Sequence, residues 1–480
     1  MSQHNRRTFL KVSGALLGGL TVGTGPAYAS TDENQRFLVD LREVDRTDVP
    51  DGVDIIHDLA EIDLLAARGN QDDVPGAAST IPDVTVYQHG SSPKGGPVQE
   101  VNATEPGNMG PAWDSGPPTP TELQWDKREQ RVGDLTERPD NKRDVHDTTK
   151  GEGTRVAVVD TGVYDGHPDL ADVVNEDLSE NFTTDQYDWR PNGAGDHGTH
   201  VAGIIAGTNA SGNGILGTAP ETEIVSHRVF SGEAGATGDS LAALYSAALK
   251  GCDVANFSVG YPYPYVDPEE YPWLLKIKVA YERLAAYARK KGMTIVNSAG
   301  NDGLDMTPEG ILSLPTEAEG IFGVSATGPI GYLWDDTLES REDISLKTLE
   351  DPTSSPAFYT NYGSAVDVSA AGGDADLEAI GKGIPGWYYD LVFSTIVQYD
   401  DNGNPVPGYG WKAGTSMSAP QVSGAYALVR SLRPDASPDE VESLIQATAE
   451  HAPGGELYHG AGHLNLRRLV REASKNQGRR

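Results

Sequence analysis

The chain has 480 residues, of which 71 are acidic and 37 are basic, so its formal net charge is −34. This length allows two or three domains with a sizeable core, and 56 Gly and 31 Pro indicate a loop-rich globular protein. The acidity argues against nucleic-acid binding, which needs clustered Lys and Arg to neutralise phosphates. A single cysteine excludes an intramolecular disulfide and a Cys-based zinc finger.

The cations are 14 Lys and 23 Arg. A surplus of negative charge this large destabilises a compact state through self-repulsion at low ionic strength. Molar salt shortens the Debye length to about 3 Å and removes most of that penalty. The acid-rich, Lys-poor balance resembles proteins of extreme halophiles, and the alternative is an ordinary acidic secreted protein.

Residues 1–29 predict an export signal. Arg6 and Arg7 precede a short, Gly-rich apolar stretch, and small residues up to Ala29 offer a cleavage site. This pattern is typical of a twin-arginine signal peptide and predicts secretion after removal of the signal. The alternative is a chance Arg pair on a weak membrane anchor, for which the apolar stretch is too short. Beyond it, no apolar run is long enough to span a bilayer.

Residues 30–110 predict a small separate module. Strand-like segments lie at 36–41 and 84–87, and further apolar residues lie between 53 and 67. The stretch 90–120 is rich in Ser, Gly, Pro and Asn, which is linker composition. A βα-type module of this size before a main domain is either a binding domain or a pro-segment.

Two motifs then place polar residues beside buried elements. The apolar run 155–162 predicts a strand buried on both faces of a parallel sheet, with Asp160 near its carboxyl end. Open α/β sheets place their functional sites at that end of a strand, although a lone Asp there is more often a helix cap or turn former. Residues 195–203 predict a closely packed helix with His197 at its start. His197 and His200 could suggest a metal, but the Glu and i, i+4 spacing of zincin sites are absent.

The third motif, Gly-Thr-Ser-Met-Ser-Ala-Pro at 414–420, predicts the start of a helix that reaches about Leu432. Ser416 at a helix N-terminus is usually an N-cap. Backbone donors at such an N-terminus also favour an oxyanion formed on Ser416. Pro420 is expected to be tolerated because N–H groups of the first turn lack intrahelical partners.

Asp160, His197 and Ser416 in this chain order resemble the triad of the subtilisin-like serine peptidases (subtilases). The resemblance runs from about residue 124 to residue 468. It implies an α/β fold with a mostly parallel central sheet flanked by helices, preceded by a small α+β pro-domain. It also implies that His197, and not His200, is the catalytic histidine. In acidity and export the chain is similar to the haloarchaeal halolysins.

This resemblance assigns chemical roles. Ser416 would attack the substrate while His197 takes its proton and later protonates the leaving amine. Asp160 would hold the histidine tautomer and stabilise the imidazolium. The Ser416 N–H and, by family resemblance, the side chain of Asn301 would bind the negative tetrahedral oxygen. Without the resemblance, residues 301–303 would be an ordinary turn.

The resemblance also predicts how substrate binds. Family members pair an extended peptide against a strand edge that matches Ser258, Val259 and Gly260, with Ala299 and Gly300 nearby. Edge pairing uses backbone groups and therefore places limited demands on side chains. The aromatic-rich insertion 261–273 either walls a subsite for apolar side chains or packs on itself as a surface loop.

Residues 30–110 would then be an inhibitory and chaperone pro-domain with its linker, cut autocatalytically between Gly90 and Trp113, and 111–480 the peptidase domain. The expected partners are extended peptides and the chain's own pro-domain, with no nucleic acid, no stable membrane anchor and a monomeric state. The chemistry needs no cofactor. The sequence leaves open whether a structural calcium ion binds. Asp169 matches a calcium ligand of the family, and oxygen ligands suit the ion. The residue spacing in the loop 208–216, however, matches the family's calcium-binding loop poorly.

Three further features concern local structure. Residues 328–356 form a long acidic insertion without an assigned role. Cys252 is expected to be a buried small residue, and Ser437 with Glu440 predicts a capping box at the start of a helix. The predicted function is a secreted, salt-adapted serine endopeptidase made as a zymogen. The alternatives are a narrow precursor-processing protease and a catalytically silent subtilase fold used as a binding or surface scaffold.

Overall fold

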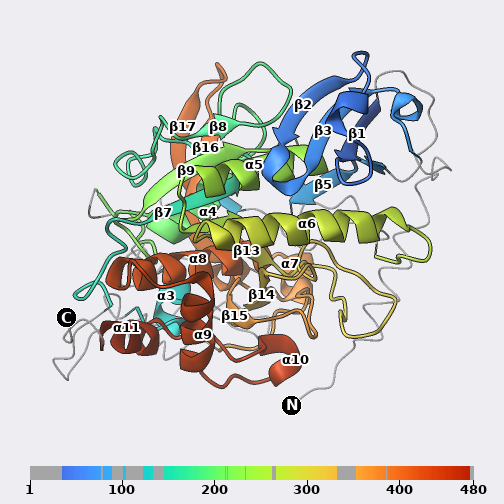
Figure 1. Ribbon diagram of the computed structural model, residues 1–480. Coiled ribbons are helices and arrows are strands. Elements are labelled where there is room, and N and C mark those ends of the chain that lie inside the picture. Colours follow the sequence, from blue (N-terminus) through green and yellow to red (C-terminus); the bar gives the residue numbers. More distant parts are fainter. Residues whose placement is uncertain are drawn as a thin grey trace, which may run out of the picture.

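A computed structural model describes residues 35–76, 79–88, 101–103, 123–132, 145–210, 212, 214–232, 234–261, 266–331, 353–384 and 386–475. The predicted signal peptide, most of the linker, residues 262–265 of the aromatic insertion and 332–352 of the acidic insertion lie outside these ranges. Figure 1 shows a large domain with helices on both sides of a central sheet and a smaller module, drawn in blue, at one side of it.

The central sheet has seven strands in the order β15-β14-β13-β11-β7-β9-β8, and all of its pairings are parallel. Its strands are β7 (Arg155–Asp160), β8 (Glu180–Asn181), β9 (Glu223–Arg228), β11 (Val254–Phe257), β13 (Thr294–Ser298), β14 (Ile321–Thr327) and β15 (Val368–Ala371). The expected α/β fold class is therefore confirmed.

Helices cover both faces of this sheet because alternate residues of each strand face opposite sides. On β7, Val156 and Val158 pack in one core with α4 (His197–Ala206) and α8 (Thr415–Leu432). Ala157 and Val159 pack in another core with α5 (Thr237–Leu249) and α6 (Trp273–Lys290). Continuous apolar runs are what a strand buried on both faces requires.

Shorter helices complete the domain: α3 (Trp125–Glu129), α7 (Leu377–Lys382), α9 (Pro438–Thr448), α10 (Glu456–His459) and α11 (Leu466–Ser474). Helix α9 starts with the predicted capping box between Ser437 and Glu440. A β-hairpin of β16 (Val392–Tyr399) and β17 (Pro405–Lys412) leads directly into α8, and the short strand β6 (Val101–Ala103) pairs with the outer edge of β17.

The N-terminal module contains an antiparallel sheet in the order β2-β3-β1-β4. Its strands are β1 (Gln35–Asp40), β2 (Asp54–Leu59), β3 (Leu64–Gly69) and β4 (Thr80–Pro82). Phe37 and Leu65 on one face join the module's own small core. Leu38 and Leu64 on the other face pack in the core of α5 and α6. One face of the module is thus buried against the large domain.

The described residues of this module contain strands and single-turn 3₁₀ helices but no α-helix, in contrast to the α+β composition expected for it. The apolar segment 53–67 forms β2 and β3 because its residues pair across the sheet, Leu59 opposite Leu64. A further strand of the module, β5 (Thr85–Gln88), leaves this sheet. It lies between β10 (Ala234–Ala236) and β12 (Val259–Gly260) of the large domain.

Candidate active site

Asp160 and His197 form a buried acid–base pair. Asp160 is the last residue of β7 and is fully buried, and His197 is the first residue of α4. Nδ1 of His197 lies 2.9 Å from each carboxylate oxygen of Asp160, and the Thr161 N–H donates to the same carboxylate at 2.7 Å. The opposite ring nitrogen, Nε2 of His197, is buried and has no hydrogen-bond partner among the described residues.

A glycine allows the start of α4 to approach the end of β7 this closely. A Cβ atom at Gly198 would lie 2.5 Å from the carbonyl oxygen of Gly162 and 3.1 Å from Cβ of Asp160. The N–H of Gly198 also donates to Thr161 Oγ1 at 2.9 Å. The absence of a side chain at Gly198 therefore allows the His197 imidazole to lie next to the Asp160 carboxylate.

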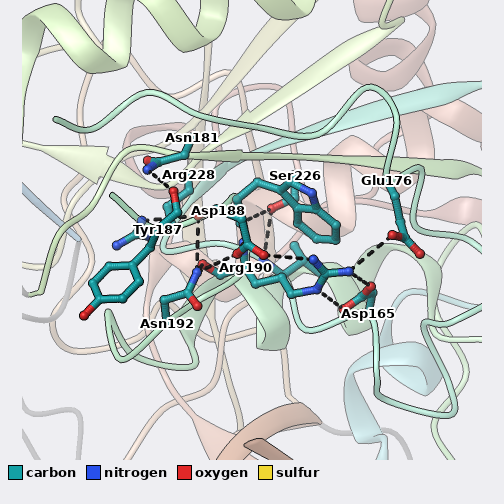
Figure 2. Close-up of polar contacts among 11 residues, drawn as sticks. Asp165, Glu176, Asn181, Tyr187, Asp188, Arg190, Asn192, Ser226 and Arg228 are labelled. Atoms are coloured by element: carbon teal, nitrogen blue, oxygen red, sulfur yellow. Dashed lines mark hydrogen bonds and ion pairs between the residues drawn. The ribbon is translucent and has the colours of Figure 1, made fainter. Parts of the chain in front are cut away.

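Guanidinium groups organise the long connection between β7 and α4 (Figure 2). Arg190 donates to both carboxylate oxygens of Asp165, at 2.7 and 2.5 Å, and to Asp188 at 3.0 Å. Buried Arg228, at the end of β9, donates to both oxygens of Asp185. These hydrogen bonds hold the pKa of Asp185 well below its usual range. The connection that carries His197 is thus fixed by ion pairs, which single-sequence reading did not identify.

Ser416 is the second residue of α8 and is fully buried. The helix begins at Thr415, so Pro420 lies in its second turn, and the expectation that it occupies the first turn is wrong. A proline there removes the N–H that the carbonyl of Ser416 would accept. The hydroxyl of Ser258 points at that carbonyl at a long distance of 3.5 Å, and Asn256 donates to this hydroxyl at 3.2 Å.

An ion pair connects the histidine and serine segments. Nζ of Lys412, at the end of β17, lies 2.9 Å from a carboxylate oxygen of Asp196, the residue before His197. Lys412 lies four residues before Ser416, and its side chain is only 2% exposed. Sequence reading missed this lysine because its partner lies more than 200 positions away.

The side chain of Asn301 is held with its amide nitrogen free. Its Oδ1 accepts hydrogen bonds from the N–H and the Oγ1–H of Thr415, each at 2.9 Å. Nδ2 is buried without a partner among the described residues. A Cβ atom built on Gly414 would lie 3.1 Å from this nitrogen and 3.6 Å from the N–H nitrogen of Ser416. The two donors therefore lie close to the same point beside Gly414.

The turn that carries Asn301 depends on Asn361, a residue that sequence reading missed. Nδ2 of Asn361 donates to the carbonyl of Ala299 at 3.0 Å, and its Oδ1 accepts from the N–H groups of Asp302 and Leu304 at 2.9 Å. Gly300, with φ +107°, leaves room for this side chain, since a Cβ there would lie 2.2 Å from Nδ2 of Asn361. No motif near residue 361 signals this role.

The predicted substrate edge is occupied by the chain itself. Val259 lies opposite Gln88 and Gly260 lies opposite Tyr87 in an antiparallel ladder. On the other side of β5, Thr85 pairs with Ala236. Val259 and Gly260 thus bind an extended segment through the backbone, and β10 supplies a second edge that the sequence did not reveal.

His200 belongs to the core. Its Nε2 lies 3.2 Å from the carbonyl oxygens of Val392 and Gly410, and burial holds its pKa well below the usual value. It links α4 to both strands of the β16–β17 hairpin. Among the described residues, no group of three or more His, Cys, Asp or Glu side chains is arranged to hold a metal ion.

Asp169 binds hydrogen-bond donors through both carboxylate oxygens. Oδ1 accepts from the Ala210 N–H at 3.1 Å, and Oδ2 accepts from the Ile215 N–H at 2.8 Å and from the Tyr409 hydroxyl at 2.9 Å. A calcium ion would need these oxygens, and the donors direct hydrogens into the position of a cation. In the part of the loop that is described, these residues do not fit a calcium ion.

Other predicted features divide between the core and the undescribed residues. Cys252 is buried, and burial raises the pKa of its thiol to about 12. Two residues of the aromatic insertion are described. Tyr261 is buried, and its hydroxyl lies 2.8 Å from that of Thr237, which agrees with the packing alternative for this residue. Trp273 is the first residue of α6. Along the described chain, every helix is too short or too polar to cross a membrane.

Comparison with known proteins agrees with this geometry. The model of the subtilase family matches residues 151–467. The chain is 31% identical to a thermophilic serine proteinase from Bacillus sp. strain AK1 over 66% of this chain and 62% of that protein. It is 28% identical to halolysin from Haloferax mediterranei over 69% of this chain and 51% of that protein.

Among solved structures, the epidermin leader peptide processing protease of Staphylococcus aureus matches 92% of this chain and 99% of its own, with a TM-score of 0.62 and 19% identity. That likeness concerns the fold. The family match covers well over half of the chain and includes Asp160, His197, Asn301 and Ser416. The chain belongs to the subtilase family.

Proposed function

We propose that the chain is a serine endopeptidase that hydrolyses peptide bonds through an acyl-enzyme intermediate. The observation that carries this proposal is the alignment of buried Asp160 with Nδ1 of His197, which leaves Nε2 free to take a proton. As in other serine peptidases, Ser416 Oγ forms a bond to the substrate carbonyl carbon while its proton passes to His197. His197 then protonates the leaving amine, and water releases the acyl group by the reverse transfers.

The oxyanion of each tetrahedral intermediate is stabilised by the Ser416 N–H and by Nδ2 of Asn301. Both donors are present before substrate binds, so little reorganisation accompanies the development of charge. The carboxylate of Asp160 keeps the His197 proton on Nδ1 and stabilises the imidazolium. A catalytically silent scaffold would need neither a preorganised donor pair nor a free Nε2, which favours catalysis over that alternative.

The same proposal assigns the N-terminal module as an inhibitory pro-domain, which makes the chain a zymogen. Strand β5 pairs with both β10 and β12, so it takes the position of a bound substrate strand. Its direction, with Tyr87 opposite Gly260 and Gln88 opposite Val259, leads toward Ser258 and the Ser416 backbone. We therefore propose that the first cut lies a few residues after Gln88, near the Gly90 end of the range from Gly90 to Trp113 expected from the sequence.

Charged groups clasp the module to the start of α5. Arg36 lies 2.8 Å from Asp83 of its own module and 2.5 Å from Asp239 of the large domain. His57 Nε2 also contacts Asp239, at 2.9 Å, and the Gly238 N–H donates to Asp83 at 2.8 Å. Half-buried ion pairs of this kind add specificity to an apolar interface.

The zymogen proposal is tested on the purified precursor. Wild type should convert to a shorter form whose new N-terminus lies a few residues after Gln88, and Ser416→Ala should stay intact. Arg36→Met should weaken the clasp and release activity sooner than wild type. Arg46→Met is the matched control, because Arg46 pairs with Asp58 of the same module and both side chains are largely exposed. An intact wild-type precursor, or equal effects of the two arginine variants, would contradict this assignment.

We further propose secretion by the twin-arginine route and function in high salt. The support is the paired arginines before a short apolar stretch and the net charge of −34. Replacing Arg6 and Arg7 by Lys should retain the precursor in the cell. The free energy of unfolding should rise between about 0.2 M and 3 M NaCl as the Debye length falls severalfold. Export of the Lys variant would refute the twin-arginine route. A free energy of unfolding that is independent of salt would refute the adaptation to high salt.

A further inference from the structure

The β16–β17 hairpin holds the first turn of α4. The Ser394 hydroxyl donates to the carbonyl of His200 at 2.8 Å. The Thr395 hydroxyl donates to the carbonyl of Thr199 at the same distance. Helix and hairpin lie so close together that a Cβ atom at Gly203 would lie 2.2 Å from Thr395 Oγ1. Helix α4, whose first residue is the proposed base, therefore packs directly on the hairpin that leads into α8.

The ion pair between Lys412 and Asp196 lies where this hairpin meets the start of α4. An Asp that precedes a helix usually accepts a hydrogen bond from an N–H group of the first turn. The Asp196 side chain accepts none from the described residues of that turn. Its carboxylate instead lies 2.9 Å from Nζ of Lys412, the last residue of β17. The two side chains are only 13% and 2% exposed, so dissolved salt screens their charges little. The carboxylate next to His197 is thus bound to the segment that precedes Ser416.

The charge of Lys412 acts on the first turn of α4. Burial, together with the Lys412 ammonium, holds the pKa of His200 well below its usual value. In the described chain, the titratable and charged groups that contact or adjoin this turn are Asp160 from β7, Asp196 before the helix, Lys412 from β17 and His200 within it. Because the charges of Asp196 and Lys412 balance each other, an imidazolium on His197 is stabilised chiefly by Asp160.

We infer that Lys412 and Asp196 form a positioning pair for the reaction of His197 with Ser416. The pair holds the start of α4 against the segment that precedes Ser416, and its two charges cancel beside His197. Both residues act through His197 rather than on the substrate. This inference rests on the proposed peptidase function and adds to it two residues that orient the base.

The cancellation predicts opposite effects when either charge is removed. The value of kcat/KM rises with pH as the base of the free enzyme loses its proton. In Lys412→Met the unbalanced Asp196 carboxylate stabilises the imidazolium, so the midpoint of this rise should move to higher pH. In Asp196→Asn the unbalanced Lys412 ammonium opposes the imidazolium, so the midpoint should move to lower pH. A unit charge about 10 Å from the base, at an effective dielectric constant between about 20 and 80, corresponds to a displacement of roughly 0.3–1.2 pH units.

The experiment measures pH profiles of kcat/KM for the mature enzyme on a short peptide amide, with active sites titrated. About 3 M NaCl is used, because a Debye length below about 3 Å screens exposed charges but not a buried pair. The two single variants should show midpoints displaced by at least about 0.3 pH units in opposite directions, and the double variant Lys412→Met/Asp196→Asn should return close to wild type. Lys150→Met is the control, because it breaks an exposed pair with Glu221 at the edge of the sheet where β7 and β9 start, and its midpoint should not move.

The double variant separates the balance of charge from the link between segments. Its charges cancel but the link is lost, so kcat should stay at least about threefold below wild type with KM unchanged. Asp196→Asn is the milder change and decides the question by the direction of its displacement if Lys412→Met does not fold. Unmoved midpoints, displacements in the same direction, or a wild-type kcat in the double variant would overturn the inference. A wild-type enzyme that does not cleave the peptide would instead contradict the proposed function.

Discussion

The hydroxyl of Thr415 is predicted to act on catalysis through Asn301. In Thr415→Val the shape of the side chain is kept, while the 2.9 Å hydrogen bond to Oδ1 of Asn301 is lost. The Gly300 N–H, which donates to the same hydroxyl at 3.1 Å, also loses its acceptor. An unsatisfied buried donor costs on the order of 1–3 kcal/mol, so the melting temperature should fall by several degrees. The remaining hydrogen bond, from the Thr415 N–H, still restrains the amide.

The effect on rate follows from what Asn301 contributes. Removal of one oxyanion donor lowers kcat by about 10²–10³-fold, a range established for a subtilisin. A displaced but present amide should lose part of that, so Thr415→Val should lower kcat roughly 3- to 30-fold with little change in KM. In the Asn301→Ala background the same substitution should change kcat by less than about twofold, because the group that it orients is gone.

The assay is hydrolysis of a short peptide amide, normalised by titration of active sites, for both single variants and the double variant. Ser418→Ala serves as a matched control, since the Ser418 hydroxyl lies in the same helix turn and donates to the Ala370 carbonyl. If Thr415→Val and Asn301→Ala act multiplicatively, the orienting role is refuted. If Ser418→Ala lowers kcat equally, the effect belongs to general packing.

Three further predictions follow from the same contacts. Lys412→Met should destabilise the fold by about 3 kcal/mol in urea unfolding, because it leaves Asp196 without its buried partner; a change below about 1 kcal/mol would contradict this. Asp169→Asn should lower the melting temperature by the same amount with calcium and with a chelator. A calcium-dependent difference would instead indicate that Asp169 binds calcium. Burial raises the pKa of Asp374 to about 8, so its contribution to stability should decrease between about pH 4 and pH 8 by roughly 1.4 kcal/mol per pH unit. In Asp374→Asn that slope should be absent, and parallel pH profiles would refute the assignment.

The fold class and the local settings of Asp160, His197 and Ser416 were predictable because each rests on a local pattern. Asp160 ends a continuous apolar strand, His197 opens a helix of small residues, and Ser416 follows Gly-Thr at the start of another helix. The chain order of the three then indicates the family. The orienting residues could not be found in this way: Asn361 lies about 60 positions from the turn it holds, and Thr415 lies 114 positions from Asn301.

The relation between the N-terminal module and the large domain was predictable only in outline. Its place and size suggested a pro-domain, but no pattern in 85–88 shows that this strand joins β10 and β12, and none in 101–103 shows the pairing with β17. Strand pairing between distant segments depends on backbone groups that every residue carries. The sequence showed that the segment 53–67 is apolar, but not that it pairs as two strands that pack on α5 and α6.

The measurement that tests the account most directly is covalent labelling of the mature protein with a fluorophosphonate probe in about 3 M NaCl, followed by mass mapping of the adduct. We predict a single adduct on Ser416, its loss in His197→Ala, which removes the base, and full labelling in Ser418→Ala. No labelling of correctly processed, folded wild type, or labelling unaffected by His197→Ala, would contradict the serine-peptidase mechanism.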